Sequence, residues 1–511
     1  MAASAEPGSR TGYGALAAVL AVVLLAALDL TVVAPILPTM ISDLGISPVD
    51  ADRYSWIVLS YLVAYTVTVP LTGRLSDFLG RLPVFGGALA LFLFGSLLAA
   101  GADDLTMMIA GRTLQGLGGG AMLPVSMALV ADIVPERQRA SALGLVAAVD
   151  TFGWVLGPVW GAGVNAVFDS WRAIFWLNLP LGAVAAVLLL VARPGVRGRS
   201  TVVRPNLLNA GVAALFLVTF SLALSTGSEG GLEAGQGAGT LGSQTNPLAD
   251  YRWPILAVSA IALVAFVALE RRSNNPLLPR DLIASVRFRL ANMANFLIGG
   301  ALIVAMINAP LVVALLADTD AVPRDTALLL GAFTLAMTVG ALAGGRLMQS
   351  AGAVAVAATG LAISAGGFVV MHFWEDELRL ATMSATMSIA GLGLGLVIAP
   401  MGETAIRAAG RASYGAASGL VLLARLLGMT VGLAGVTAYG LARLDALIAG
   451  LPPVSPIPGE SASDYFARQQ EYLETQLIPL TLDVIRETFL LAAAVCLVAM
   501  LVVAFIRFQR E

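Results

Sequence analysis

Four charged residues lie inside apolar stretches of this 511-residue sequence: Asp29, Arg112, Asp150 and Arg425. An Asp or Arg at the centre of a membrane-spanning helix costs about 2.5 to 3.5 kcal/mol on insertion scales. Such residues normally face the interior of a helix bundle and mark a path for ions or substrate. A buried carboxyl group can also take up and release a proton. The pattern therefore predicts transport chemistry, with Asp29 and Asp150 as candidate proton sites.

The residue types needed for most catalytic and metal sites are scarce. Cys496 is the only cysteine and His372 the only histidine, so a Cys cluster is impossible and a His-based site would depend on one residue. No GxxxxGK[ST] motif is present, which argues against an ATP-driven pump. A net charge of −3 gives no argument for nucleic-acid binding. We expect no enzyme, no catalytic residue, no metal and no cofactor, with a proton gradient as the energy source.

The elements that carry these charges must cross a membrane. Hydrophobic residues make up 58% of the chain and charged residues 12%, roughly half of what a soluble protein carries. The composition predicts an all-α membrane protein with about fourteen spanning segments. These segments are 13–40, 55–72, 84–101, 105–133, 140–165, 173–192, 206–226, 253–270, 290–316, 326–346, 352–373, 379–400, 414–450 and 485–507.

Arginine placement predicts the orientation. If the N-terminus is inside, most arginines fall in cytoplasmic loops, whereas outer loops are acidic, as at Asp50 and Asp52 or Asp103 and Asp104. Both termini are then cytoplasmic.

Two outer regions differ from the other loops. Residues 226–250 are rich in glycine and of low complexity, which predicts a flexible tether. The segment 414–450 would be about 55 Å long as a helix, longer than the hydrocarbon core of about 30 Å. Part of it should project outside and could pair with 461–488. The alternative is a tilted helix beside a loose loop.

The loop after the second segment carries a family motif. Gly73, Leu75, Asp77, Gly80 and Arg81 look like G-x-L-a-D-r-x-G-r of the major facilitator superfamily, although its variable basic positions are absent. A weak copy, GGRLMQSAG at 344–352, lies in the equivalent loop of the second half. Parallel repeats of this kind are typical of that transporter class.

Three further motifs follow in the order expected for this family. RTLQGLGGG places Arg112 and Gln115 as in R-x-x-Q-G-x-G, and LDLTVVAPILP resembles the helix-1 signature of fourteen-helix drug:proton antiporters. The fifth segment fits the antiporter motif G-x8-G-x3-G-P-x2-G-G except at its last glycine. Its matching residues are Gly144, Gly153, Gly157, Pro158 and Gly161. The chain is identified as a member of this superfamily.

A closer resemblance covers most of the chain. Residues 391–450, the segment from Trp56 to Tyr61 and the extension at 461–488 look like the mycobacterial triacylglyceride exporters. The helix-5 acid of those exporters lies about one position from Asp150. The resemblance implies a lipid substrate, the bacterial inner membrane as location, and a periplasmic lipid-binding lipoprotein as a candidate partner.

The resemblance also implies a division of the chain. Residues 1–192 would form an N-terminal six-helix half, and 193–289 a linker with two inserted helices and the flexible loop 226–250. Residues 290–511 would form the C-terminal half, with an outer helical extension over about 441–488. The helix-5 glycines and Pro158 permit a bent, closely packed helix at the interface of the halves.

The family architecture places Asp29 and Arg425 at equivalent positions of opposite halves. We hypothesise that they pair across the central cavity and that protonation of Asp29 releases Arg425; the alternative is a permanent ion pair that only fixes packing. Asp150 is either a second protonation site or an acid kept neutral by burial. Arg112 either lines the same cavity or is an anchor bonded to backbone.

In this family the acid matching Asp77 helps to lock the cytoplasmic side, using an arginine and the positive end of a helix dipole. Arg407 or Arg411 is the candidate partner, and an exposed loop salt bridge is the alternative.

The resulting hypothesis is a proton-coupled exporter of triacylglyceride-like lipid that works by alternating access. The alternative is multidrug efflux, which uses the same helix-1 and helix-5 motifs. Lipid export predicts an apolar cavity open to the bilayer, whereas efflux of drug cations predicts unpaired acids. A non-transporting scaffold is a third reading, against which the cost of intramembrane Asp and Arg argues.

Overall fold

The computed structural model describes residues 10–33, 36–44, 56–192, 206–225, 251–274, 276–318, 321–409, 413–451 and 461–506. These residues form helices and connecting turns, and none of them forms a strand. The N-terminal bundle consists of α1 (Arg10–Thr31), α2 (Leu37–Asp43), α4 (Trp56–Leu79), α5 (Arg81–Ala100), α6 (Leu105–Ile133), α7 (Glu136–Phe168) and α8 (Arg172–Ala192).

A linker pair follows, α9 (Leu207–Ser225) and α10 (Arg252–Arg272), and then the short α11 (Arg280–Ala284). The C-terminal bundle consists of α12 (Val286–Leu316), α13 (Val322–Ala351), α14 (Ala353–Met371), α15 (Leu380–Ala409), α16 (Tyr414–Ile448), α17 (Ala462–Tyr472), the π-helical η4 (Leu473–Leu477) and α18 (Ile478–Ile506).

Within the described residues, twelve helices are long and apolar enough to cross a membrane. The other two predicted spans correspond to α7, which has 33 residues, and to the shorter apolar α9. The all-α membrane fold predicted from composition is therefore confirmed. The flexible loop expected at 226–250 lies outside the described residues.

The first predicted span is interrupted. We expected one helix over 13–40, but α1 ends at Thr31 and α2 starts only at Leu37. Pro35 lies between them in the sequence, and proline has no amide hydrogen with which to continue a helical ladder. The break falls two residues after Asp29, so this acid lies in the last turn of α1.

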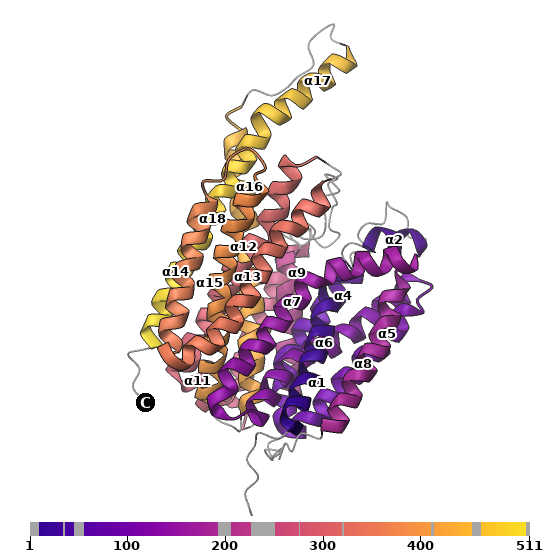
Figure 1. Ribbon diagram of the computed structural model, residues 1–511, viewed down its shortest axis with the longest axis vertical. Coiled ribbons are helices and arrows are strands. Elements are labelled where there is room, and N and C mark those ends of the chain that lie inside the picture. Colours follow the sequence, from indigo (N-terminus) through magenta and orange to yellow (C-terminus); the bar gives the residue numbers. More distant parts are fainter. Residues whose placement is uncertain are drawn as a thin grey trace, which may run out of the picture.

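The last span is longer than expected. Residues 463 to 506 form one continuous helical segment of 44 residues, roughly 66 Å at 1.5 Å per residue. Because a hydrocarbon core is about 30 Å thick, α17 and η4 project well beyond the bundle, as Figure 1 shows at the top. At the base of this projection the Tyr439 hydroxyl donates to Glu487 at 2.6 Å, and Arg443 pairs with Glu487 at 3.1 Å.

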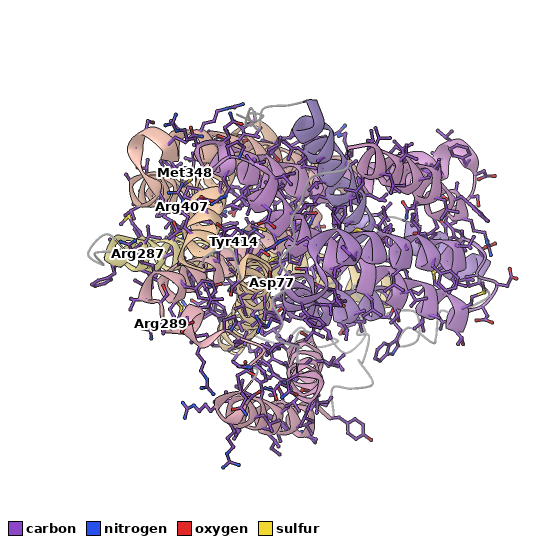
Figure 2. The ribbon with its side chains drawn as sticks, turned by 90° about the horizontal axis from the view of Figure 1, so that it is seen from below. Asp77, Arg287, Arg289, Met348, Arg407 and Tyr414 are labelled. Atoms are coloured by element: carbon purple, nitrogen blue, oxygen red, sulfur yellow. The ribbon has the colours of Figure 1, made fainter. Side chains whose placement is uncertain are left out.

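The two bundles meet at the end of the molecule that carries Asp77. There α4 packs on α16 and α7 on α13, and in Figure 1 the ribbons diverge toward the α2 and α17 end. The Ser141 hydroxyl donates to the carbonyl of Gly345 at 3.3 Å, and Gln349 donates to Ser141 at 2.7 Å. Seen from this end, Asp77 of α4 lies near Tyr414 of α16 in the middle of the molecule (Figure 2).

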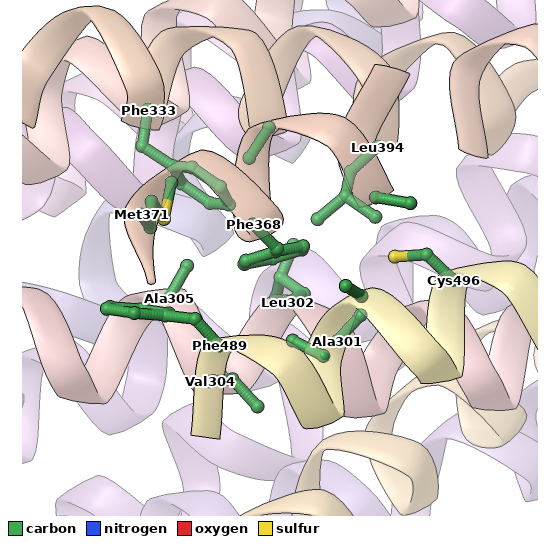
Figure 3. Packing of buried hydrophobic residues seen from close by; sticks show 14 of the residues in the cluster. Ala301, Leu302, Val304, Ala305, Phe333, Phe368, Met371, Leu394, Phe489 and Cys496 are labelled. Carbon is green, nitrogen blue, oxygen red and sulfur yellow. The ribbon is translucent and has the colours of Figure 1, made fainter. Parts of the chain in front are cut away.

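Aromatic packing holds the C-terminal bundle together. The rings of Phe368 on α14 and Phe489 on α18 stack with centroids 6.5 Å apart, and Trp374 meets Phe489 edge-on at 5.2 Å. Figure 3 shows Phe368 and Phe489 with Phe333, Leu302 and other apolar side chains of the cluster. Rings in such arrangements add about 0.5 to 1.5 kcal/mol beyond area burial.

Close helix contact in the C-terminal bundle depends on Gly428. A methyl group there would collide with the carbonyl oxygen of Phe296 on α12, whereas one on Gly435 of the same helix would meet nothing within 4 Å. We predict that Gly428→Ala lowers the thermal unfolding temperature in detergent, since overpacking costs about 1 to 3 kcal/mol.

Gly435→Ala is the matched control. It should leave the unfolding temperature unchanged or raise it, because alanine favours a helix by about 1 kcal/mol over glycine. Equal effects of the two variants would contradict the packing argument.

Candidate functional site

The first buried charge cluster surrounds Asp29, whose side chain is 0% exposed. Its carboxylate accepts hydrogen bonds from Arg112 Nη1 at 2.7 Å, from Gln115 Nε2 at 3.1 Å and from Asn178 Nδ2 at 3.0 Å. These donors come from α6 and α8, so three helices of the N-terminal bundle meet at one carboxylate. A buried charge in hydrocarbon needs such local compensation.

The donors around Asp29 are themselves held in place. Ser96 Oγ on α5 accepts from Gln115 at 2.8 Å and from Asn178 at 3.2 Å. The Arg112 guanidinium lies 4.2 Å from the centroid of the Tyr61 ring and also donates to Gln115 Oε1 at 3.0 Å. A polar network satisfied at every member fixes side-chain geometry more strongly than its single bonds suggest.

The predicted pairing of Asp29 with Arg425 is wrong. The ion-pair partner of Asp29 is Arg112, one turn from Gln115 on a helix of the same bundle. Arg112 was expected either to line the cavity or to act as a structural anchor bonded to backbone. The geometry corresponds to the anchor, but the main acceptor of Arg112 is a carboxylate rather than a backbone carbonyl. The reason is packing: α1 lies against α6 inside one bundle, so the nearest guanidinium comes from within that bundle.

The second buried charge cluster lies where the bundles face each other. Arg425 on α16 donates from Nη2 to Asn295 Oδ1 on α12 at 3.4 Å, and its buried Nε has no hydrogen-bond partner among the described residues. Asp150 on α7 is close enough to Arg425 for their charges to interact. Among the described residues, the Asp150 carboxylate accepts no hydrogen bond and makes no direct ion pair. Asp150 and Arg425 are therefore opposite charges on the two bundles that make no direct ion pair among the described residues.

Most glycines of the helix-5 motif face α1 rather than the other bundle. A methyl group on Gly153 would lie 2.5 Å from the Cβ of Ala27, and methyl groups on Gly157 and Gly161 would collide with Thr31 and Val32. These glycines join α7 to α1 close to Asp29. The expected role at the interface of the halves fits only Gly144, where a methyl group would lie 2.7 Å from the carbonyl oxygen of Ala341 on α13. The Pro158 side chain lies outside the described set.

Asp77 caps the first turn of α16. Its two carboxylate oxygens accept from the backbone amides of Gly415 at 3.0 Å and Ala416 at 2.9 Å. Gly73 lies one turn earlier, where any side chain would collide with the carbonyl oxygen of Gly415. The acid thus binds the positive end of a helix in the opposite bundle.

An arginine pair surrounds this cap. Arg81 Nη2 lies 3.3 Å from Asp77, and Arg81 also pairs with Asp132 at the end of α6. The Tyr414 ring lies under two guanidinia, 5.9 Å from Arg81 and 5.3 Å from Arg139.

The arginine that pairs with Asp77 in the structure is neither of the two expected from the sequence. Arg407 forms its ion pair with Glu403 of its own helix at 2.6 Å, and Arg411 lies outside the described residues. Arg81, a member of the same sequence motif, provides the described ion pair. Gly80 has a φ of 95°, which explains the glycine between α4 and α5.

Several residues of these clusters were missed from sequence. Asn178 had a readable signal, since an amide within the apolar segment WLNLP must find a partner in the membrane. Asn295 had the same signal, as an amide next to the apolar run FLIGGALIV. Ser96, Tyr61 and Asp132 had none, because serine and tyrosine are common in such helices and Asp132 lies near a helix end. No group of three or more metal-ligating side chains occurs among the described residues.

The fold and these charge clusters define a multi-pass membrane transporter rather than an enzyme. The chain belongs to the major facilitator superfamily, whose family model matches residues 19–433.

Relatives and solved structures agree with this assignment. The chain is 34% identical to a triacylglyceride transporter of Mycolicibacterium hassiacum over 96% of its own length and 91% of the relative. It is 34% identical to a triacylglyceride transporter of Mycobacterium tuberculosis, covering 85% of this chain and 84% of the relative. The human organic anion transporter MFSD10 has a similar fold, with a TM-score of 0.54, 16% identity and coverage of 95% of this chain and 99% of that one.

Arg112 should contribute more to stability than Arg425. Removing one member of a buried ion pair leaves the other charge uncompensated and costs about 3 to 5 kcal/mol. We predict that Arg112→Gln lowers the thermal unfolding temperature in detergent more than Arg425→Gln does. The double variant Asp29→Asn with Arg112→Gln should recover part of the loss. A larger effect of Arg425→Gln would contradict the assignment of the anchor.

The cap on α16 should keep the two bundles together. Ser418 on α16 is fully buried and donates to the carbonyl of Pro124 at 2.7 Å, so a cysteine at this position reports on separation of the bundles. In a Cys496→Ser, Ser418→Cys background, we predict that Asp77→Asn raises the rate of thiol labelling by about tenfold. This corresponds to losing charge-assisted hydrogen bonds worth about 1.5 kcal/mol or more.

Asp132→Asn is the control for this measurement, because it removes a partner of Arg81 but leaves the two bonds to α16. Its labelling rate should rise less. Equal labelling in the two variants would show that the helix cap does not hold the bundles together.

Proposed function

We propose that this transporter exports a triacylglyceride-like lipid across the bacterial inner membrane in exchange for protons. The proposed substrate class is supported by the similarity, over nearly the whole chain, to transporters named for triacylglyceride. The proposed orientation has both termini in the cytoplasm, because the arginine-rich loops lie at the Asp77 end. A periplasmic lipid-binding lipoprotein is the proposed acceptor, and the projecting α17 would lie on its side of the membrane.

The balance of buried charge supports a neutral substrate. Each of the two mid-membrane acids faces an arginine: Asp29 faces Arg112, and Asp150 faces Arg425. A transporter of drug cations would be expected to have more buried acids than buried arginines, because an unpaired acid attracts the positive charge of the substrate. The four residues together carry no net charge, which favours lipid over cationic drugs.

The proposed coupling site is Asp150 with Arg425 rather than Asp29. Both oxygens of the Asp29 carboxylate already accept hydrogen bonds, so protonating either one would displace at least one donor and remove the counter-charge of Arg112. Asp150 has no hydrogen bond to lose within the described chain and lies between the bundles. Protonation of Asp150 would leave Arg425 without a counter-charge and so change the free energy of bringing α7 and α16 together.

The test is transport in proteoliposomes under an imposed pH gradient, with a fluorescent triacylglyceride and a cationic dye assayed in parallel. We expect the lipid to move and the dye to remain. Asp150→Asn should abolish the stimulation by the gradient, while Asp318→Asn, which removes an exposed acid, should leave it intact.

Three outcomes would contradict parts of this proposal. Movement of the dye alone would identify a drug antiporter. Movement of lipid with an unimpaired gradient effect in Asp150→Asn would remove Asp150 from coupling. Loss of the gradient effect in folded Asp29→Asn, with Asp150→Asn unaffected, would assign coupling to the Asp29 cluster.

A further inference from the structure

The connection from α10 to α12 carries an unusual density of positive charge. Residues 270–289 contain five arginines against two acids, a net charge of +3. The arginines are Arg271, Arg272, Arg280, Arg287 and Arg289. This connection lies at the same end of the molecule as Asp77, because Leu282 of α11 and Phe288 of α12 pack with Ala416 near the start of α16. Figure 2 shows Arg287 and Arg289 toward the edge of this end.

The positions of exposed apolar residues place these arginines at the level of lipid headgroups. On α10, Val264 and Val267 are 70% and 40% exposed, and Arg271 continues the same helical face one turn later. On α12, Met293 is 50% exposed and lies one turn after Arg289. Residues on exposed faces of spanning helices contact lipid tails, so an arginine one turn beyond them reaches the phosphate layer.

The connection is an ordered platform. The Glu270 carboxylate accepts from the Leu278 amide at 2.5 Å and from Asn209 of α9 at 2.6 Å. Arg280 donates to the carbonyls of Arg271 at 2.9 Å and Ser273 at 3.0 Å, which satisfies the end of α10. One acid and one arginine of the segment are thereby used for structure.

Three arginines of the connection are available to a ligand. Arg271, Arg272 and Arg289 are exposed, and none of them forms an ion pair with a residue that the structure describes. The only other acid of the segment, Asp281, is exposed and likewise makes no ion pair with described residues. Guanidinium groups bind phosphate through two parallel hydrogen bonds, which a planar fork provides without rearrangement.

We propose that the α10–α11–α12 connection is a binding site for anionic phospholipid headgroups of the surrounding leaflet. The position of the arginines, one turn from side chains that face lipid tails, favours a lipid phosphate over a soluble one. Ile283 of α11 is 40% exposed while its neighbour Leu282 is buried, so α11 presents an apolar side chain beside the charges. A headgroup bound here would connect the linker pair to the C-terminal bundle. The site does not depend on the proposed substrate.

The test uses a fluorophore attached beside the platform. In a Cys496→Ser background, Ala284→Cys at the exposed end of α11 is labelled, and the protein is reconstituted into phosphatidylcholine vesicles. Brominated phosphatidylglycerol or brominated phosphatidylcholine is then added as quencher. We expect stronger quenching by the anionic lipid, and this preference should fall at high salt because exposed charges are screened.

The double variant Arg271→Gln with Arg289→Gln should remove the preference for the anionic lipid. The loss of each arginine should lower the apparent affinity for this lipid roughly fivefold. Arg137→Gln with Arg346→Gln removes two exposed arginines from the same end of the molecule and should retain it. Equal quenching by the two lipids in the parent protein would overturn the proposal. A preference for the anionic lipid that survives Arg271→Gln with Arg289→Gln would also overturn the proposal. If the control pair lost the preference to the same extent, the effect would be general charge attraction and not a site, which would overturn it too.

Discussion

Every feature of the site follows from one constraint: a charge within the hydrocarbon must be compensated by the protein itself. Asp29 meets this requirement completely, with one guanidinium and two amides directed at its carboxylate. Among the described residues, Asp150 meets it through the charge of Arg425 alone. The first arrangement ties helices of one bundle together, whereas the second lies between the bundles and leaves hydrogen-bonding capacity unused. This difference in compensation is the reason for proposing Asp150, rather than Asp29, as the group that changes its protonation state.

Close backbone contact complements these charges. Glycines at three positions of α7 admit α1 next to the Asp29 cluster, so helix packing and charge compensation support each other there. At the Asp77 end, Gly73 and Gly415 bring α4 and α16 together until the Asp77 carboxylate reaches the free amides of α16. The cap can form only in the state in which these helix ends touch. The same carboxylate would lose two amide donors when the bundles separate.

The sequence predicted the helices and the motif residues well, because spanning segments depend on local composition and the motifs on residue type and order. It did not predict which charges pair. Asp29, Arg112 and Arg425 were all recognised, but pairing depends on helix rotation and packing, which a linear pattern does not encode. The break after Thr31 could have been anticipated from Pro35. The contribution of Ser96 and Tyr61 could not, since neither residue is unusual in a membrane helix.

The continuous helix from α17 through η4 to α18 has a mechanical consequence. About half of its length of roughly 66 Å extends past the hydrocarbon layer, so a tilt of about 10° would sweep its tip sideways by roughly 6 Å. The helix acts as a lever whose inner half is packed among α12 and α14. The π-helical turn η4 lies in the outer half, and turns of this kind are often found at functional sites. A tilt inside the membrane is thereby carried into a displacement of similar size at the outer tip.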